Sequence, residues 1–268
     1  MQDILGVELI SQFLKALRAR RHTEEPIRII CLGYQEILLP DIYIRHKFGE
    51  KAFDTLYNRP SQETIIKFFQ KPNVSRVPTT DSFFRLFGNV TCDSLDYQKH
   101  EGSEIIVDMN FELPGHLREK YDICIDSGTC EHIFNIGQAF TNCAELVKVG
   151  GSVFHTNPIN FINHGFYNLC PILYPDFYEN NGFKTIHLKG VAYNQKQRLT
   201  TDLKEMFQEF SVFDLPADRS IQIKSDIRIN VHYVAQKKQQ VDSYTYPIQS
   251  KYKGPNGLYT RLNKSGAG

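Results

Sequence analysis

The sequence has no apolar run approaching the roughly 20 residues that a helix needs to cross a bilayer. Its first residues, MQDILGVELI, lack the charged-then-apolar layout of a secretory signal peptide. The six cysteines form no CxxC pair, and most of them lie within apolar segments. These absences predict a cytoplasmic protein with reduced, mostly buried thiols, without a disulfide framework or a zinc-cysteine site.

An excess of either charge is also missing. The 31 Lys and Arg residues nearly balance the 30 Asp and Glu residues, which leaves a net charge of +1. This balance gives no electrostatic reason to expect nucleic acid or an anionic membrane as a partner. The dense basic run Arg18, Arg20 and Arg21 is typical of a solvated helix end. The partner that remains is a small molecule, and the sequence leaves the oligomeric state open.

Short apolar runs alternate with amphipathic segments along most of the 268 residues. The spacing predicts a helix over residues 3–20 and a buried strand over residues 27–32. Further strands are expected at 90–95, 103–107, 121–125 and 152–155, with an antiparallel pair at 184–188 and 227–235 that flanks a helix at 199–210. Such alternation predicts an α/β protein with a mainly parallel sheet and helices on both faces.

The first strand runs into CLGYQEIL, which contains a single glycine, Gly33. Nucleotide-binding turns at this place usually carry several glycines. Three acids, Asp96, Asp108 and Asp126, each follow a predicted strand. An acid after the second strand can accept the hydroxyls of a ribose, and one after the third can accept from an adenine amine. The pattern predicts a ligand site at the carboxyl ends of the strands.

The segments YDICIDSGTCEHIFN and AELVKVGGSVFHTNP resemble the class I S-adenosylmethionine-dependent methyltransferases. The segment HGFYNLCPILYPDFYENNGF resembles a pattern of a bacterial subgroup associated with glycan or natural-product biosynthesis. The resemblance implies a Rossmann-like, mainly parallel seven-stranded sheet with an antiparallel last strand. It also implies methyl transfer from S-adenosylmethionine to a small polar acceptor, foremost a hydroxyl of a sugar, sugar nucleotide or related metabolite.

Periodicity, composition and the extent of the resemblance together divide the chain, and the resemblance implies a set of cofactor residues. Residues 1–26 would form an N-terminal helix, 27–236 the methyltransferase-like domain, and 237–268 a polar, loosely held tail. Residues 40–88 would be a helical insertion that caps the acceptor site. The cofactor residues implied are Gly33, Gln35, Asp96, Asp108, Met109, Asp126 and Ser127.

The first turn departs from the family pattern. Cys31 stands where an acid is usual, and Gln35 and Ile37 replace the later glycines. About 60 residues separate Gly33 from Asp96, where roughly 20 is usual in nucleotide folds. A sulfonium cofactor has no phosphates to cradle, so one glycine can suffice. The alternative is a non-catalytic binding or scaffold protein, with Tyr34 and Gln35 filling the cofactor space. A nicotinamide oxidoreductase would need GxGxxG, which is absent.

His132 and His164 lie past predicted strand ends and are the expected catalytic bases. For each, the competing interpretation is an orienting hydrogen bond. His155 lies inside a strand pattern and is expected to be a satisfied core group. The loop residues Asn163, Tyr167 and Asn168 suit a polyhydroxylated acceptor.

Glu131, His132 and His164 also raise the possibility of a metal site. Some small-RNA 2′-O-methyltransferases hold a divalent ion with Glu-x-x-Glu-His on this loop. Gly128 stands at the earlier Glu position, which leaves at most three ligands and one carboxylate. The sequence therefore favours a site without metal.

Overall fold

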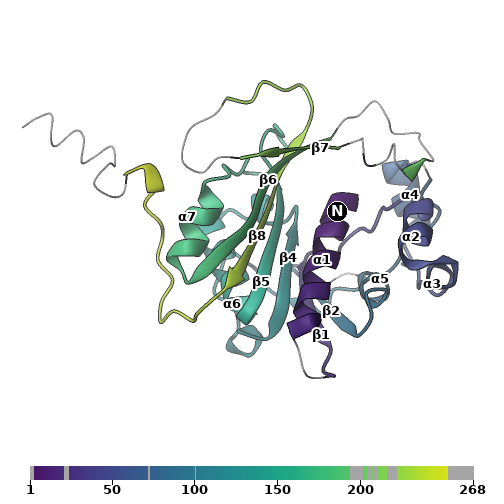
Figure 1. The fold of residues 1–268 in the computed structure, drawn as a ribbon, viewed down its shortest axis with the longest axis horizontal. Coiled ribbons are helices and arrows are strands. Elements are labelled where there is room, and N and C mark those ends of the chain that lie inside the picture. Colours follow the sequence, from purple (N-terminus) through teal and green to yellow (C-terminus); the bar gives the residue numbers. More distant parts are fainter. Residues whose placement is uncertain are drawn as a thin grey trace, which may run out of the picture.

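A computed structural model describes residues 3–20, 24–71, 73–99, 101–193, 202, 203, 207, 210–215 and 222–252. These residues form one eight-stranded sheet with the order β3-β2-β1-β4-β5-β8-β6-β7 (Figure 1). The strands are β1 (Ile27–Leu32), β2 (Val90–Asp96), β3 (Ile105–Ile106), β4 (Tyr121–Ser127), β5 (Val147–Pro158), β6 (Phe183–Tyr193), β7 (Phe210–Asp214) and β8 (Ile229–Lys237).

The first five strands are parallel, and the last three are joined antiparallel. Strand β1 pairs in parallel with β2 and β4, and β4 pairs in parallel with β5. Strand β8 is antiparallel to both β5 and β6, and β7 is antiparallel to β6. This is an α/β fold with a Rossmann-like, mainly parallel sheet, helices on both faces and antiparallel strands at its end, as the sequence predicted. The strand order reverses between β1 and β4, and this is where such sheets place their ligands.

Two elements differ from the expectation. Strand β7 adds an eighth strand at the sheet edge, beyond the seven predicted. Strand β3 has only two residues where five were expected, since its register with β2 covers only the pairs Leu95–Ile105 and Asp96–Ile106. The helix expected at 199–210 falls largely outside the described residues, and Phe210 itself begins β7.

Apolar side chains of β1 point alternately to the two faces of the sheet and pack into two separate hydrophobic cores. Ile27, Ile29 and Cys31 pack on one face of the sheet, and Ile30 and Leu32 pack on the other. This period of two is the geometry of a strand that is buried on both faces. The second face is covered by α6 (Ile136–Leu146) and α7 (Leu173–Asn180), which supply Phe140, Phe177 and Tyr178 to its core.

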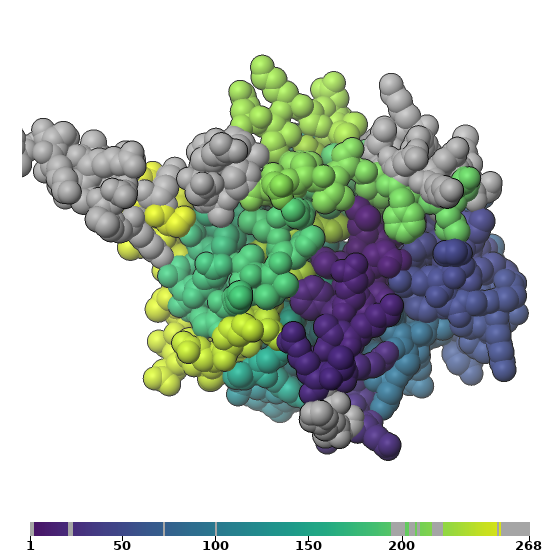
Figure 2. Space-filling view, viewed as in Figure 1, coloured from purple at the N-terminus to yellow at the C-terminus, as the bar shows by residue number. Residues whose placement is uncertain are grey.

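The first face is covered by α1 (Ile4–Arg20) and by the insertion at residues 40–88. Residues 40–88 contain the helices α2 (Asp41–Phe48), α3 (Glu50–Asp54), α4 (Gln62–Phe69) and α5 (Thr80–Arg85). Residues of α1 and of the insertion share one hydrophobic core, including Val7, Tyr43 and Phe83. In Figure 2 the purple atoms of α1 lie directly beside the blue atoms of the insertion.

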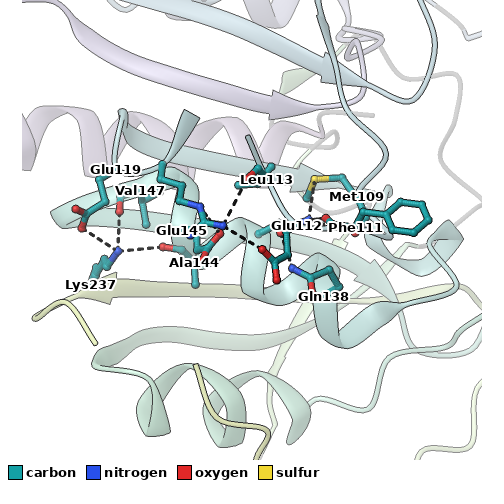
Figure 3. Close-up of polar contacts among 12 residues, drawn as sticks. Met109, Phe111, Glu112, Leu113, Glu119, Gln138, Ala144, Glu145, Val147 and Lys237 are labelled. Carbon is teal, nitrogen blue, oxygen red and sulfur yellow. Dashed lines mark hydrogen bonds and ion pairs between the residues drawn. The ribbon is translucent and has the colours of Figure 1, made fainter. Parts of the chain in front are cut away.

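Lys237, the last residue of β8, is buried and binds backbone carbonyls at the end of α6 and the start of β5. Lys237 has no exposed surface, and its Nζ donates to the carbonyl oxygens of Ala144 and Val147 at 3.2 and 3.0 Å (Figure 3). Glu119 lies 3.4 Å from the same nitrogen and supplies a counter-charge. Burial of an ammonium is tolerated only with such partners.

The described part of the tail is attached rather than loosely held. Asn181 at the end of α7 donates to the carbonyl of Thr245 at 3.0 Å and accepts the Thr245 N–H at 2.8 Å. The N–H of Ser250, which begins a short 3-10 helix (Ser250–Tyr252), donates to Asp176 at 3.0 Å. Side chains in and just after α7 therefore bind the backbone of the tail. The polar composition of the tail did not predict this attachment.

The six cysteines are free, and four are buried, as predicted. Over the part of the chain that the structure describes, no helix combines the length and apolar character that a membrane crossing requires.

Candidate active site at the carboxyl ends of the strands

The turn after β1 is the centre of the site. Gly33 has φ of +72°, a backbone conformation that favours glycine. Its N–H donates to the carbonyl of Leu95 at 2.7 Å, which ties the turn to the end of β2. A Cβ atom at Gly33 would lie 3.3 Å from Thr129 Oγ1 and 3.9 Å from Asp96 Oδ2. Three strand ends therefore converge on Gly33, and the structure brings the predicted Gly33 and Asp96 together.

The second predicted acid, Asp108, lies just after β3, the strand next to β2. The N–H of Val107 donates to the carbonyl of Asp96 at 2.9 Å, so the chain reaches Asp108 immediately beside β2. Asp108 accepts hydrogen bonds from the backbone and side chain of Asn110 at 2.9 and 2.7 Å, which fixes its carboxylate in an Asx turn. Asp96 accepts its neighbour's N–H, from Tyr97, at 2.7 Å. Both acids are held at neighbouring positions along the sheet edge.

The polar residues after Gly33 pack into the protein. Gln35 is 4% exposed, and its amide donates to the carbonyl of Leu32 at 2.7 Å, so it supports the turn from inside. The Tyr34 ring is covered by the Arg59 guanidinium, whose carbon lies 4.3 Å from the ring centroid. A Cβ at Gly102 would lie 2.1 Å from that ring, so Gly102 lets the loop approach Tyr34 closely. Arg59 places the insertion beside the turn.

Asp126 is buried in a network of hydrogen bonds. One oxygen accepts the N–H groups of Thr129 and Cys130 at 2.9 and 3.1 Å, and the other contacts His155 Nδ1 and Asn157 Nδ2, both at 2.8 Å. Burial opposes ionisation, but these hydrogen bonds outweigh it and hold the pKa of Asp126 below its usual value. The sequence implied that Asp126 lines the cofactor; in the structure its two oxygens organise the turn after β4.

His155 is the buried core group that its strand position indicated. It is 2% exposed, its second ring nitrogen lies 2.6 Å from the Tyr178 hydroxyl, and it stacks on Phe140. Met109 is also internal, since it is 4% exposed and its carbonyl accepts from Asn142 at 3.2 Å. Ser127 ends β4 and is 7% exposed. His155, Met109 and Ser127 are therefore all buried close to the carboxyl ends of the strands.

The two predicted histidines lie together beyond β4 and β5. His132 ends a 3-10 turn (Cys130–His132), and His164 lies in the loop after β5. Their ring centroids are 5.0 Å apart, and each side chain is 45% exposed. Glu131 Oε1 lies 3.9 Å from His132 Nε2 and 3.5 Å from His164 Nε2. The pair therefore forms one solvent-accessible cluster with a buried carboxylate beneath it.

Burial favours the uncharged forms of Glu131 and His164. Burial, and secondly the charge of Asp126, raises the pKa of Glu131 to about 7. Burial, followed by the charges of His132 and Arg228, lowers the pKa of His164. A neutral imidazole carries a lone pair that can accept a proton or bind a cation.

The loop around His164 is pinned by its backbone. The N–H groups of Phe166 and Tyr167 donate to the carbonyl of Glu131 at 2.9 and 3.2 Å. Of the predicted substrate residues, Tyr167 donates its hydroxyl to the carbonyl of Phe134 at 2.7 Å, and Asn168 accepts the N–H of Phe161 at 2.6 Å. Asn163 is exposed, with φ of +59°. Asn163 thus faces solvent, while Tyr167 and Asn168 shape the loop.

Sequence reasoning did not assign a role to Asn157. Its amide joins Asp126 to Glu131, at 2.8 and 3.0 Å, and its oxygen accepts the Tyr174 hydroxyl at 2.7 Å. The signal in the sequence was a polar residue at the end of an otherwise apolar strand. Arg59 was likewise missed, because nothing in the insertion's helical patterns marks which side chain reaches the first turn.

No model of a protein family matches this chain, and no curated protein matches it. Solved structures with a similar fold include an S-adenosylmethionine-dependent methyltransferase from Archaeoglobus fulgidus, with 9% identity, a TM-score of 0.40, and coverage of 86% of this chain and 94% of that one. Another is the Burkholderia thailandensis 1,6-didemethyltoxoflavin-N1-methyltransferase, with 11% identity, a TM-score of 0.36, and coverage of 85% and 76%.

The methyltransferase domain of the citrinin polyketide synthase is also similar, with 9% identity and a TM-score of 0.40. This chain is covered to 89% in that comparison but spans only about half, 53%, of the synthase chain. These similarities to methyltransferases concern the fold alone.

Proposed function

We propose that the protein transfers a methyl group from S-adenosylmethionine to a hydroxyl of a small polar acceptor, foremost a sugar, sugar nucleotide or related metabolite. The observation that carries this proposal is the convergence of Gly33, Asp96 and Thr129 at the point where the strand order reverses. Rossmann-like sheets bind their ligands at this point. Methyl transfer rather than hydride transfer is favoured because the turn lacks the glycines that pyrophosphate requires.

The cofactor would lie across the ends of β1, β2 and β3. Asp96 would accept the ribose hydroxyls and Asp108 the adenine side, while the missing Cβ of Gly33 lets the methionine part pass close to the backbone. Ser127 would line the path toward the methyl group. Three of the expected cofactor residues would support the site without touching the cofactor, because their side chains are buried. Gln35 contacts the turn, Met109 the core and Asp126 the loop after β4.

The acceptor would bind beside His132 and His164. Its hydroxyl oxygen would form a C–O bond to the methyl carbon while its proton passes to one of these two imidazoles. The bound cofactor would supply the activated methyl group, and the electrons of the broken C–S bond would stay with sulfur. Positioning is the main demand of such a step, and the histidines activate the hydroxyl. Phe134 and Phe166, 73% and 67% exposed with ring centroids 5.9 Å apart, offer an apolar surface for one face of a ring. Asn163 would add a polar contact.

The insertion at residues 40–88 would form one wall of the cofactor and acceptor site. This is supported by Arg59, which covers Tyr34, and by Thr80, whose hydroxyl donates to the carbonyl of Gln35 at 3.3 Å. The alternative of a non-catalytic scaffold would apply if Tyr34 and its partners exclude the cofactor altogether.

Incubation with isotopically labelled S-adenosylmethionine and a panel of sugars, sugar nucleotides, phenols and amines, read by mass spectrometry, tests the proposal. A labelled hydroxyl product is expected. The variant His164→Ala should lower turnover more than cofactor affinity, whereas the exposed His116→Ala should change neither. Label on nitrogen or carbon would correct the acceptor class, and full activity of His164→Ala would remove that histidine from the site.

A further inference from the structure

Three potential ligand atoms meet at the cluster formed by Glu131, His132 and His164. One carboxylate oxygen and two imidazole nitrogens lie within 4.8 Å of one another. The carboxylate oxygen Oε1 is 3.5 Å from His164 Nε2 and 3.9 Å from His132 Nε2. Two ligands bound at about 2.1 Å to one ion lie roughly 3 to 3.5 Å apart. The cluster is thus within a small side-chain adjustment of a coordination geometry.

The buried carboxylate oxygen supplies a second, independent observation. Glu131 has no exposed surface, and among the described residues its Oε1 has no hydrogen-bond partner. Its other oxygen, Oε2, accepts from Asn157 at 3.0 Å. A buried carboxylate oxygen without a partner is costly, and native proteins rarely leave one so. Oε1 lies near both imidazoles, where a cation would satisfy it.

The surroundings hold Glu131 in place from two sides. Asn157 bridges it to Asp126, and such outer hydrogen bonds orient the groups that bind a metal. The loop that carries His164 is seated directly on the Glu131 backbone, because a Cβ at Gly165 would lie 2.8 Å from the Glu131 carbonyl oxygen. A residue larger than glycine would push the loop, and His164 with it, away from the carboxylate.

We propose that Glu131, His132 and His164 bind one divalent transition-metal ion. Two imidazoles and one carboxylate suit Zn²⁺, Fe²⁺, Mn²⁺ or Co²⁺ better than Mg²⁺ or Ca²⁺, which prefer oxygen ligands. Three protein ligands leave coordination positions open, and the half-exposed histidines place those positions toward solvent. The sequence favoured a site without metal, because Gly128 leaves only three ligands. The proximity of these three, and the Glu131 Oε1 that lacks a hydrogen-bond partner among the described residues, support a three-ligand site instead.

The proposed function gives the site a role, and this part of the inference rests on it. A hydroxyl bound at an open position loses its proton more readily, because the ion stabilises the resulting oxyanion. Two neighbouring hydroxyls of a sugar can occupy two open positions together. The histidines would then activate the acceptor as ligands of the ion, and the released proton would pass to solvent.

The test uses the untagged full chain, stripped with a chelator that is then removed, and titrated with ZnCl₂, MnCl₂ and CoCl₂ in a calorimeter. One ion per chain is expected, with Co²⁺ giving visible absorption bands. Loss of an outer hydrogen bond typically weakens metal sites 10–100-fold, so His132→Ala and His164→Ala should each weaken binding by about 100-fold or more. Both side chains are half exposed, so these variants should fold; His116→Ala is the matched control.

The same stripped protein is titrated with S-adenosylmethionine to separate the two proposals. Absence of metal binding, or binding that His132→Ala and His164→Ala leave unchanged, overturns the metal site even if the cofactor binds. Metal binding without cofactor binding leaves the site in place and overturns the proposed methyl transfer. A third variant, Glu131→Gln, keeps the shape of the side chain and should weaken metal binding as the histidine variants do.

Discussion

The Nδ1 atom of His155 lies 2.8 Å from Oδ2 of Asp126, and neither side chain has exposed surface. This pair joins β4 to β5 at the end where the site lies, and Asn157 extends it to Glu131. The network therefore connects the packing of the sheet to the position of Glu131, which lies beside His132 and His164.

Replacement of Asp126 by alanine should destabilise the whole domain. Two backbone N–H groups, His155 and Asn157 would lose their shared acceptor, and each buried unpaired group costs about 1–3 kcal/mol. We expect Asp126→Ala to lower the free energy of unfolding in urea by about 3 kcal/mol or more. The exposed Asp214→Ala should leave it unchanged, since surface ion pairs contribute little. A stable Asp126→Ala protein that merely loses ligand affinity would assign Asp126 to direct binding instead.

Asp96 is the residue on which cofactor recognition should depend most. Loss of a hydrogen bond to a charged group costs about 1.5–3 kcal/mol. The change Asp96→Ala should therefore weaken binding of S-adenosylmethionine by about 10- to 150-fold in calorimetry. Asp54→Ala, an exposed acid on α3, is the control and should bind as the unmodified protein does. An unchanged dissociation constant for Asp96→Ala would show that the ribose lies elsewhere.

A comparison of two glycine variants can distinguish the effect of backbone strain from the effect of contact with the cofactor. Gly33 (φ +72°) and Gly49 (φ +93°) both disfavour a side chain, but a Cβ at Gly49 would meet nothing within 4 Å. Alanine at either place should cost about 1–3 kcal/mol of stability, because both backbone conformations are strained for any residue with a Cβ atom. Only Gly33→Ala should also weaken binding of S-adenosylmethionine, because its methyl group projects toward Asp96 and Thr129. Equal cofactor affinity in the two variants would mean that the cofactor does not pass this turn.

The fold was predictable because its signals are local. The alternation of Ile27, Ile29 and Cys31 with Ile30 and Leu32 predicts a strand that is buried on both faces. The acids at the strand ends mark the carboxyl edge of the sheet, which is where open α/β sheets generally bind ligands. The direction of a side chain at such an edge is not local. Asp96 is the last residue of β2 and Asp126 the last but one of β4. Asp126 nevertheless turns inward, because His155 and Asn157 on the neighbouring strand supply its hydrogen bonds.

Contacts between distant segments were the part that sequence could not supply. The sequence indicated His132 and His164 as separate candidates. Their proximity is evident only in the structure, where the loop that carries His164 is hydrogen-bonded to the Glu131 backbone. Arg59 reaches Tyr34 from the insertion, and Lys237 reaches the carbonyls of Ala144 and Val147 from the last strand. Each of these depends on packing that brings remote residues together.

Asp3 should make the stability of the fold sensitive to acid. Burial opposes its ionisation, but His232 and hydrogen bonds from Tyr193 and Gly6 outweigh this and lower its pKa from 3.8 to about 2. Because the folded pKa is depressed, the stabilisation is present above the unfolded pKa and is lost as the pH falls from about 4 to about 2. A shift of this size corresponds to about 2 kcal/mol.

Urea unfolding of the unmodified protein and of Asp3→Asn at a series of pH values measures this contribution. The unmodified protein should be the more stable of the two at neutral pH, and the difference should shrink as the pH approaches about 2. A difference that is independent of pH would show that Asp3 contributes through the shape of its hydrogen bonds and not through its charge.

The most direct measurement is calorimetric titration of the full chain with S-adenosylmethionine and with S-adenosylhomocysteine. The convergence of Gly33, Asp96 and Thr129 at the strand ends predicts saturable binding of both compounds at one site per chain. Absence of binding heat for either compound at millimolar concentration would contradict the proposed methyl transfer and favour a scaffold that keeps the fold without its cofactor.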